Sequence, residues 1–217
     1  PTFKQIKQWF WDNLHPDNNP MDDAKVFENV FWNGNYTGIF QFINDKTQNF
    51  MRQMKPKSVT DIAVATSIFR PGPLSLKVDQ RFLINRNNPD MVKYKHPLLK
   101  EVFAETSGLL VFQEQLQMIY HKLAGVPLEE TDGIRKAFTK KEINNKEKAQ
   151  AERNKLRQSF IEACNKANNI DAEDCGEIFD EMEKLVAYSF NKCLHKDTLV
   201  ERSEEHTSEL QSLRHLV

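Results

Sequence analysis

Gly133-Ile-Arg-Lys-Ala-Phe-Thr-Lys-Lys-Glu142 opens the most basic segment of a chain of 217 residues. Between Arg135 and Lys166 there are ten Lys or Arg residues and four Glu residues, a surplus of six positive charges in a chain whose formal net charge is −1. Such a surplus creates a local positive field that attracts polyanions. The alternative is a solvated helix face on which Lys and Glu alternate, and charge alone favours that alternative.

The composition is that of a folded protein. Hydrophobic residues make up 39% of the chain, enough to bury the core of one large domain or two small ones. The sequence has no apolar run of about 18 residues and no signal peptide at its start, so it predicts a cytoplasmic protein without a membrane segment. The three cysteines form no Cys-x-x-Cys pair and predict neither a disulfide framework nor a zinc site.

Apolar residues recur at helical spacing along most of the chain and predict a mainly α fold with at most short strands. The expected helices cover residues 3–14, 21–32, 50–68 on both sides of Pro56, 96–106, 109–123, 147–168 and 172–190, the last with an acidic outer face. Thr37–Phe42 alternates briefly and predicts a short strand or an extended link. Arg70-Pro-Gly-Pro-Leu74 predicts a rigid elbow that is extended at Arg70 and Gly72. A helical pattern that starts directly at Pro1 is expected of a chain cut from something longer.

Nine short motifs, in their order and spacing, resemble those of the alpha subunit of bacterial replicative DNA polymerase III, a family C DNA polymerase. Each motif alone is weak, but together they cover residues 21–192. The motifs are Gly38-Ile-Phe-Gln-Phe42, Asp61-Ile-Ala63, Arg70-Pro-Gly-Pro-Leu74, Tyr94-Lys-His-Pro-Leu98, Thr106-Ser-Gly108, Phe112-Gln-Glu-Gln115, Leu123-Ala-Gly125, Ile134-Arg-Lys-Ala-Phe138 and Tyr188-Ser-Phe-Asn-Lys192.

The resemblance implies a multi-helix fingers domain. It divides the chain into a palm-to-fingers connection at 1–36, the fingers at 37–192, the first block of an intein at 193–201, and an artefactual or disordered tail at 202–217. The tail looks like translated sequencing adapter. A stand-alone helical module that binds nucleic acid or protein without catalysis is the alternative, and the flanking reading frame distinguishes the two.

The family's chemistry is phosphoryl transfer with two divalent metal ions, Mg²⁺, held by palm aspartates. The resemblance places these aspartates upstream of the matched region, so it implies that this chain has no catalytic residue and no metal site and is inactive alone. Asp22, Asp23 and Asp61 are expected to be helix-start and surface acids instead.

The resemblance also implies which residues contact phosphate. It places Arg135, Lys136, Lys140 and Lys141 in the family's basic fingers motif, where contact with the incoming dNTP is expected, and this context favours function over a solvated face. The later charges from Lys146 to Lys166 are still expected to form a solvated helix face. Further candidates for nucleotide or DNA phosphate are Arg70, for which capping of helix-end carbonyls is an equal alternative, and Asn191 and Lys192 of the last motif.

The implied partners are a DNA primer-template, dNTP, and, through missing regions, the sliding clamp and other replisome subunits. Gln113 and Gln115 are expected to hydrogen-bond the backbone rather than the minor groove. His96 and His121 are expected to be structural or exposed rather than catalytic.

The sequence departs from the family in three places. Thr139 and Ser189 stand where the family usually has glycine, which adds a hydroxyl and removes freedom at positive φ. Cys193-Leu-His-Lys-Asp-Thr-Leu-Val200 looks like the opening block of an intein, in which the Cys193 thiol would take over the preceding acyl group. A variant loop with an inert cysteine is the alternative there.

Overall fold

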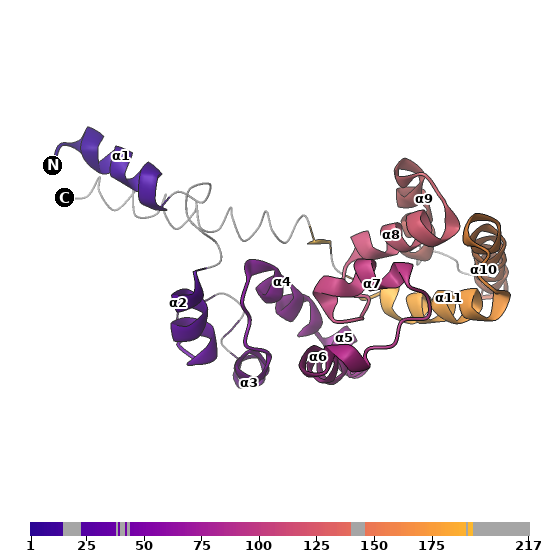
Figure 1. Ribbon diagram of the computed structural model, residues 1–217, viewed down its shortest axis with the longest axis horizontal. Helices are drawn as coiled ribbons and strands as arrows, with labels where there is room; N and C mark the ends of the chain where they lie inside the picture. Colours follow the sequence, from indigo (N-terminus) through magenta and orange to yellow (C-terminus); the bar gives the residue numbers. More distant parts are fainter. Residues whose placement is uncertain are drawn as a thin grey trace. The chain divides into compact units, whose positions relative to one another are not determined.

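The computed structural model describes residues 1–14, 23–37, 39, 42, 44–139, 146–189 and 191–192 (Figure 1). In this part of the chain there are eleven α-helices and no β-strand, which confirms the mainly α fold. None of the helices in these ranges is long and apolar enough to cross a membrane. Residues 193–217, including Cys193 and the predicted tail, lie outside the described residues.

The described residues divide into two compact units. The first comprises Pro1–Ala63 together with Lys192, and the second is Val64–Asn191. The domain boundary expected between residues 36 and 37 stays a prediction.

The first unit is held together by buried aromatic rings. It contains α1 (Phe3–Leu14), α2 (Ala24–Val26), the π-helix η1 (Phe27–Trp32), α3 (Asp45–Met54) and the first part of α4 (Val59–Ile68). The rings of Phe31, Tyr36 and Phe42 lie 6.0 to 6.3 Å apart, and the Tyr36 hydroxyl donates to the Phe31 carbonyl at 2.5 Å. The Phe42 carbonyl accepts from the Gln48 amide at 2.9 Å, which ties this cluster to α3.

Of the short strand or extended link expected at Thr37–Phe42, the described residues Thr37, Ile39 and Phe42 form no strand. The Ile39 N–H donates to the Tyr36 carbonyl at 3.0 Å and the Phe42 N–H to the Ile39 carbonyl at 3.3 Å, so both bonds join residues three positions apart. The Tyr36 and Phe42 rings stack with their centroids 6.2 Å apart.

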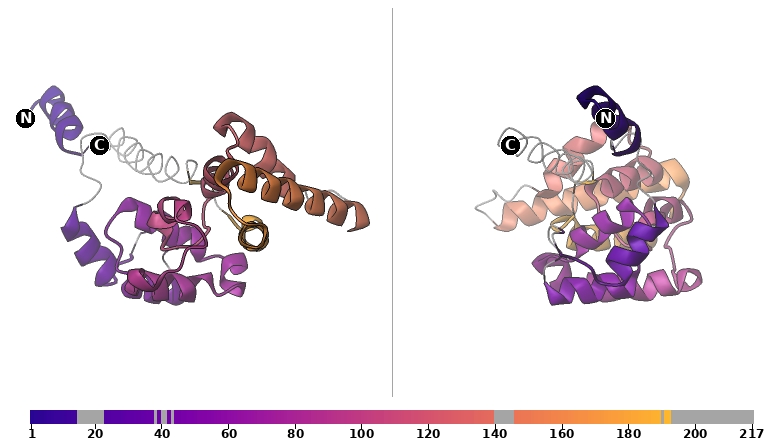
Figure 2. Two further views of the ribbon diagram at one scale, coloured as in Figure 1. Left: turned by 45° about the vertical axis from the view of Figure 1, so that its right-hand side comes forward. Right: turned by 90° about the vertical axis from the view of Figure 1, so that its left-hand side faces the viewer.

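The second unit is built around α8 (Gln113–Ala124). This helix contacts α7 (Leu98–Phe103), α9 (Leu128–Thr139), α10 (Lys146–Asn168) and α11 (Ala172–Val186) (Figure 2). The remaining elements are α5 (Pro71–Ser75), α6 (Val78–Asn87) and the short 3₁₀ segments η2 (Pro89–Met91) and η3 (Ala104–Thr106). The predicted helices at 147–168 and 172–190 are confirmed, although the second ends at Val186.

The core of this unit contains an aromatic cluster from four helices. Tyr120 of α8 lies 4.8 Å from the Phe160 ring of α10 and 6.2 Å from the Phe138 ring of α9, measured between ring centroids. Phe179 of α11 completes the cluster, 5.3 Å from Phe138 and 5.9 Å from Phe160. Because Phe138 follows the basic residues of α9, the cluster supports the helix that carries them.

Tyr120 leaves its hydroxyl oxygen buried and without a hydrogen-bond partner among the described residues. Burial also raises the pKa of this phenol, so the hydroxyl stays protonated. Tyr120→Phe removes the unpaired group and keeps the ring, so we expect the free energy of unfolding to stay unchanged or to rise by about 1 kcal/mol. Urea unfolding measures the change, and a loss of more than about 1 kcal/mol would mean that the hydroxyl is paired in solution.

The Arg70-Pro-Gly-Pro-Leu74 elbow is only partly extended. Arg70 is extended, with φ −130° and ψ 154°, as expected, but Pro71–Ser75 forms the short helix α5, so the extended geometry predicted at Gly72 is wrong. The prolines fall in the first turn, where a missing N–H costs no helical hydrogen bond. Gly72 lies so close to Tyr188 that a Cβ there would be 2.1 Å from the Tyr188 Cδ1 atom.

Helix α8 starts four residues later than the expected 109–123. The Gln115 side-chain oxygen accepts from the backbone N–H groups of Val111 and Phe112 at 2.8 and 2.9 Å. Its amide nitrogen donates to the Val102 carbonyl at 3.0 Å and to the Thr106 hydroxyl at 2.7 Å. These bonds begin the helix at Gln113, after the buried and extended Phe112.

Candidate anion-binding site

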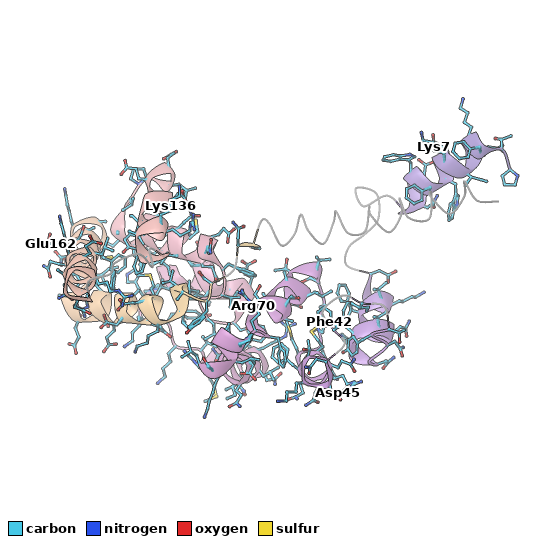
Figure 3. All side chains as sticks on the ribbon, turned by 180° about the vertical axis from the view of Figure 1, so that it is seen from behind. Lys7, Phe42, Asp45, Arg70, Lys136 and Glu162 are labelled. Atoms are coloured by element: carbon cyan, nitrogen blue, oxygen red, sulfur yellow. The ribbon has the colours of Figure 1, made fainter. Side chains whose placement is uncertain are left out.

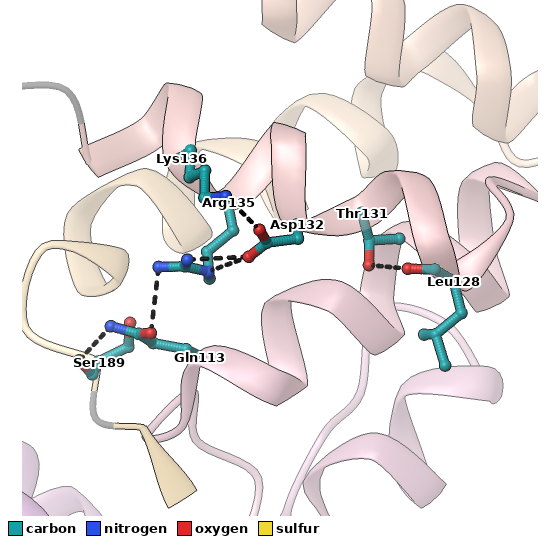
Figure 4. Close-up of polar contacts among 7 residues, drawn as sticks. All are labelled: Gln113, Leu128, Thr131, Asp132, Arg135, Lys136 and Ser189. Carbon is teal, nitrogen blue, oxygen red and sulfur yellow. Dashed lines mark hydrogen bonds and ion pairs between the residues drawn. The ribbon is translucent and has the colours of Figure 1, made fainter. Parts of the chain in front are cut away.

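Two of the predicted cations share one carboxylate on α9 (Figure 4). Arg135 reaches the Asp132 Oδ1 atom with Nε at 2.9 Å and Nη2 at 2.8 Å, and the Lys136 Nζ atom lies 2.7 Å from Oδ2. The spacing of three and four residues puts these side chains on one helix face. The cations also lie toward the C-terminal end of α9, while Glu129 and Glu130 occupy its first turn, an order that suits the helix dipole.

The three side chains of this cation cluster, Asp132, Arg135 and Lys136, carry one net positive charge. Hydrogen bonds from Lys136 and then Arg135 hold the pKa of the Asp132 carboxyl below its ordinary value, so Asp132 is ionised at neutral pH. The Arg135 side chain is 23% exposed and that of Lys136 is 65% exposed. The cluster therefore combines a half-buried, planar guanidinium with a solvated ammonium, two groups that suit phosphate oxygens.

Arg135 is also tied to a neighbouring helix and to the segment after α11. Its Nη1 atom donates to the Gln113 Oε1 atom at 3.3 Å, and the Gln113 amide nitrogen donates to the Ser189 carbonyl at 3.4 Å. The Ser189 hydroxyl donates to the Val186 carbonyl at 2.7 Å, so this hydroxyl is satisfied.

The other predicted phosphate contacts come from other parts of the chain. Arg70 is exposed at the start of α5, and Lys136 lies on α9 (Figure 3). Asn191 follows Ser189 by two residues, while Lys192 belongs to the other unit. Lys140 and Lys141 lie outside the described residues, as does the intein nucleophile predicted at Cys193. Their roles stay predictions.

The acidic face of α11 is not simply a solvated outer face. Four of its acids pair with basic residues from three other segments: Asp180 with Arg157 at 2.8 Å, Glu183 with Arg153 at 3.0 Å, Glu181 with Arg81 at 3.0 Å, and Glu177 with Lys95. Arg157 hydrogen-bonds Asp180 through two nitrogens and lowers the pKa of that carboxyl. Part of the surplus charge of residues 135–166 therefore pairs α10 with α11, where a solvated helix face was expected.

Polar residues outside the cation cluster have structural roles. Both glutamines bond the backbone as expected, Gln115 from a buried position. The His96 Nδ1 atom accepts from the Leu98 N–H at 3.3 Å at the start of α7, and the His121 Nδ1 atom lies 2.8 Å from the Val126 carbonyl. Both histidines therefore contact backbone groups next to a helix end.

The helix-start acids behave as expected where they are described. The Asp23 carboxylate accepts from the Lys25 N–H at 2.9 Å. The Asp61 carboxylate accepts from the Lys57 N–H at 2.8 Å, and the Asp61 backbone N–H donates to the Ser58 hydroxyl oxygen at 3.1 Å. Within the described ranges no group of three or more His, Cys, Asp or Glu residues could hold a metal ion.

Sequence reasoning missed Asp132 and the link from Gln113 to Ser189. The signal for Asp132 was present, because an acid three and four residues before two cations predicts helical ion pairs. The link from Gln113 joins residues 22 and 76 positions away, and no local pattern could have found it.

The fold and these contacts define a helical domain that presents paired cations on one of its helices. Residues 1–168 match the family described as the bacterial DNA polymerase III alpha subunit finger domain. The chain belongs to this family.

Proteins similar in sequence match most of the chain. It is 34% identical over 186 residues to the DNA polymerase III subunit alpha of Staphylococcus epidermidis, covering 86% of this chain and 16% of that protein. It is 35% identical over 174 residues to the DNA polymerase III subunit alpha of Chlamydia pneumoniae, covering 80% of this chain and 13% of that protein. The chain thus spans a small fraction of the length of the relatives it matches.

Proposed function

We propose that this chain is the part of a replicative DNA-directed DNA polymerase that binds the phosphates of the incoming dNTP and of template DNA. The observation that carries the proposal is the cation cluster on α9, in which Arg135 and Lys136 converge on one carboxylate. A phosphate group offers the same kind of paired, anionic oxygens as Asp132 does. Membership of the finger-domain family supports this assignment.

Phosphate would bind beside Asp132 and add to the contacts of the cluster. Arg135 and Lys136 would hydrogen-bond phosphate oxygens while they keep their contacts with Asp132, and those contacts hold the pKa of the Asp132 carboxyl low. The single net positive charge of the cluster attracts an anion, although the attraction is modest in water. Lys140 and Lys141, which follow on the same motif, and Arg70, Asn191 and Lys192 complete the proposed set of phosphate contacts.

The parent protein would supply the rest of the reaction. We propose that templated DNA synthesis uses Mg²⁺ ions held by palm aspartates outside this chain, as the family's phosphoryl-transfer chemistry implies. The chain alone would bind and not catalyse. Its partners would be a primer-template, dNTP, and replisome subunits such as the sliding clamp, in the cytoplasm.

A binding experiment on the full chain tests the proposal. Fluorescence anisotropy of a labelled primer-template is measured over a range of KCl concentrations. We expect Arg135→Gln with Lys136→Gln to weaken binding and to reduce the slope of log affinity against log salt by about one to two, because up to two phosphate contacts are lost.

The matched control is Lys155→Gln with Lys166→Gln, which removes the same charge from exposed positions of α10. We expect a smaller change from this pair. An equal loss from both pairs would mean a diffuse field rather than a site, and an unchanged slope in the α9 variant would rule out phosphate contact there. Binding of DNA that depends on neither pair would favour the stand-alone module.

A further inference from the structure

Gln113 occupies a position between two partners that come from different parts of the second unit (Figure 4). It is the first residue of α8 and is half-buried. Its Oε1 atom accepts from Arg135 Nη1 at 3.3 Å, and its Nε2 atom donates to the Ser189 carbonyl at 3.4 Å.

The two partners fix the orientation of this amide by their chemistry. A guanidinium only donates hydrogen bonds and a carbonyl oxygen only accepts them, so the amide oxygen must face Arg135 and its nitrogen must face Ser189. A glutamate could accept from Arg135 but could not donate to the Ser189 carbonyl at neutral pH. A methionine of similar length could do neither.

The Arg135 guanidinium is consequently held along two edges. Asp132 takes the edge that carries Nε and Nη2, and Gln113 takes Nη1. The plane of a guanidinium decides which pair of oxygens it can contact at once. Fixing that plane before the ligand arrives lowers the ordering cost of binding.

Ser189, the second partner of the Gln113 amide, is itself held in place by hydrogen bonds. The Ser189 N–H donates to the Val186 carbonyl at 3.1 Å, and the Ser189 hydroxyl donates to the same oxygen at 2.7 Å. Tyr188, the preceding residue, lies against Gly72 with no room for a Cβ between them. The Gln113 amide therefore ties Arg135 to the end of α11.

We propose that Gln113 is a positioning residue that sets the guanidinium plane of Arg135 and thereby strengthens the binding of a triphosphate at α9. The inference rests on the phosphate role of Arg135 proposed above and adds a residue that acts through it. Gln113 itself does not touch the ligand. This role needs both hydrogen bonds of the amide, which neither glutamate nor methionine can make at this position.

The test uses the full chain and inorganic tripolyphosphate, followed by NMR on the arginine Nε–H signals. We expect Gln113→Met to raise the Kd about threefold to tenfold, the net worth of one ordinary hydrogen bond, because the lost bond acts on the ligand only through Arg135. The Arg135 Nε–H should exchange faster with water because its side chain is less ordered. Gln113→Glu should also bind more weakly, since it removes the net positive charge of the cluster and the bond to Ser189.

A double-mutant cycle separates positioning from a general structural effect. In the Arg135→Gln background, Gln113→Met should change the Kd no further, and Gln117→Met on the same helix should leave it unchanged in either background. An equal loss in both backgrounds, or wild-type affinity in Gln113→Met, overturns the inference while the phosphate role stands. Wild-type affinity in Arg135→Gln itself overturns both.

Discussion

Gln115→Leu is expected to lower the free energy of unfolding of the Val64–Asn191 unit by about 3–5 kcal/mol. The side chain is 4% exposed and makes four hydrogen bonds, two accepted from backbone N–H groups and two donated. Leucine fills a similar volume but leaves the Val111 and Phe112 N–H groups and the Val102 carbonyl buried without a partner. Each orphaned group costs about 1–3 kcal/mol, and partial relaxation keeps the sum below the maximum.

Urea unfolding monitored by near-UV circular dichroism measures this loss. Gln117→Leu is the matched control, two residues along the same helix on a less buried side chain, and we expect it to cost less than about 0.5 kcal/mol. Amide exchange of Val111 and Phe112 should quicken only in the Gln115 variant. Equal losses from the two variants would show that leucine disturbs α8 generally and that the four bonds contribute little.

The helices of the second unit were predictable because their apolar spacing is local. The long helix α10 was expected from residue 147 and begins at Lys146, since Phe160 and Cys164 recur at the helical period and are buried. The start of α8 was not predictable, because Gln115 reaches back to Val111 and Phe112 and to distant partners at Val102 and Thr106. The apolar pattern extends back to Leu109, but the capping bonds start the helix only at Gln113.

The candidate site likewise has residues that local sequence predicts and residues that only tertiary packing brings in. Charge surplus and the resemblance to a finger domain pointed to Arg135 and Lys136, and the ion pairs with Asp132 follow from spacing alone. Gln113 and Ser189 join the site through the packing of α8 and α11 against α9, which is tertiary. For the acidic face of α11 the sequence pattern predicted an outer face, whereas the structure pairs its acids with arginines of α10 and α6.

Phe160→Ala is expected to destabilise the same unit by about 3–5 kcal/mol. Its ring is 1% exposed and lies 4.8 Å from the Tyr120 ring and 5.9 Å from the Phe179 ring, so alanine leaves a cavity where α8, α10 and α11 meet. Phe138 of α9 contacts Tyr120 and Phe179 and would lose part of its support. The variant should therefore also weaken binding of the primer-template, although Phe160 lies in the core and touches no ligand.

Thermal or urea unfolding measures the stability, and anisotropy at a temperature where the variant is still folded measures the binding. Phe160→Leu should restore most of the stability, because it refills the cavity with apolar volume. Ile84→Ala on α6, where the side chain is 62% exposed, should change stability by less than about 0.5 kcal/mol. A Phe160→Ala protein that unfolds like the wild type would mean that the aromatic cluster does not hold α9 in place, and the support it is argued to give Arg135 would then have to come from Gln113 and Asp132 alone.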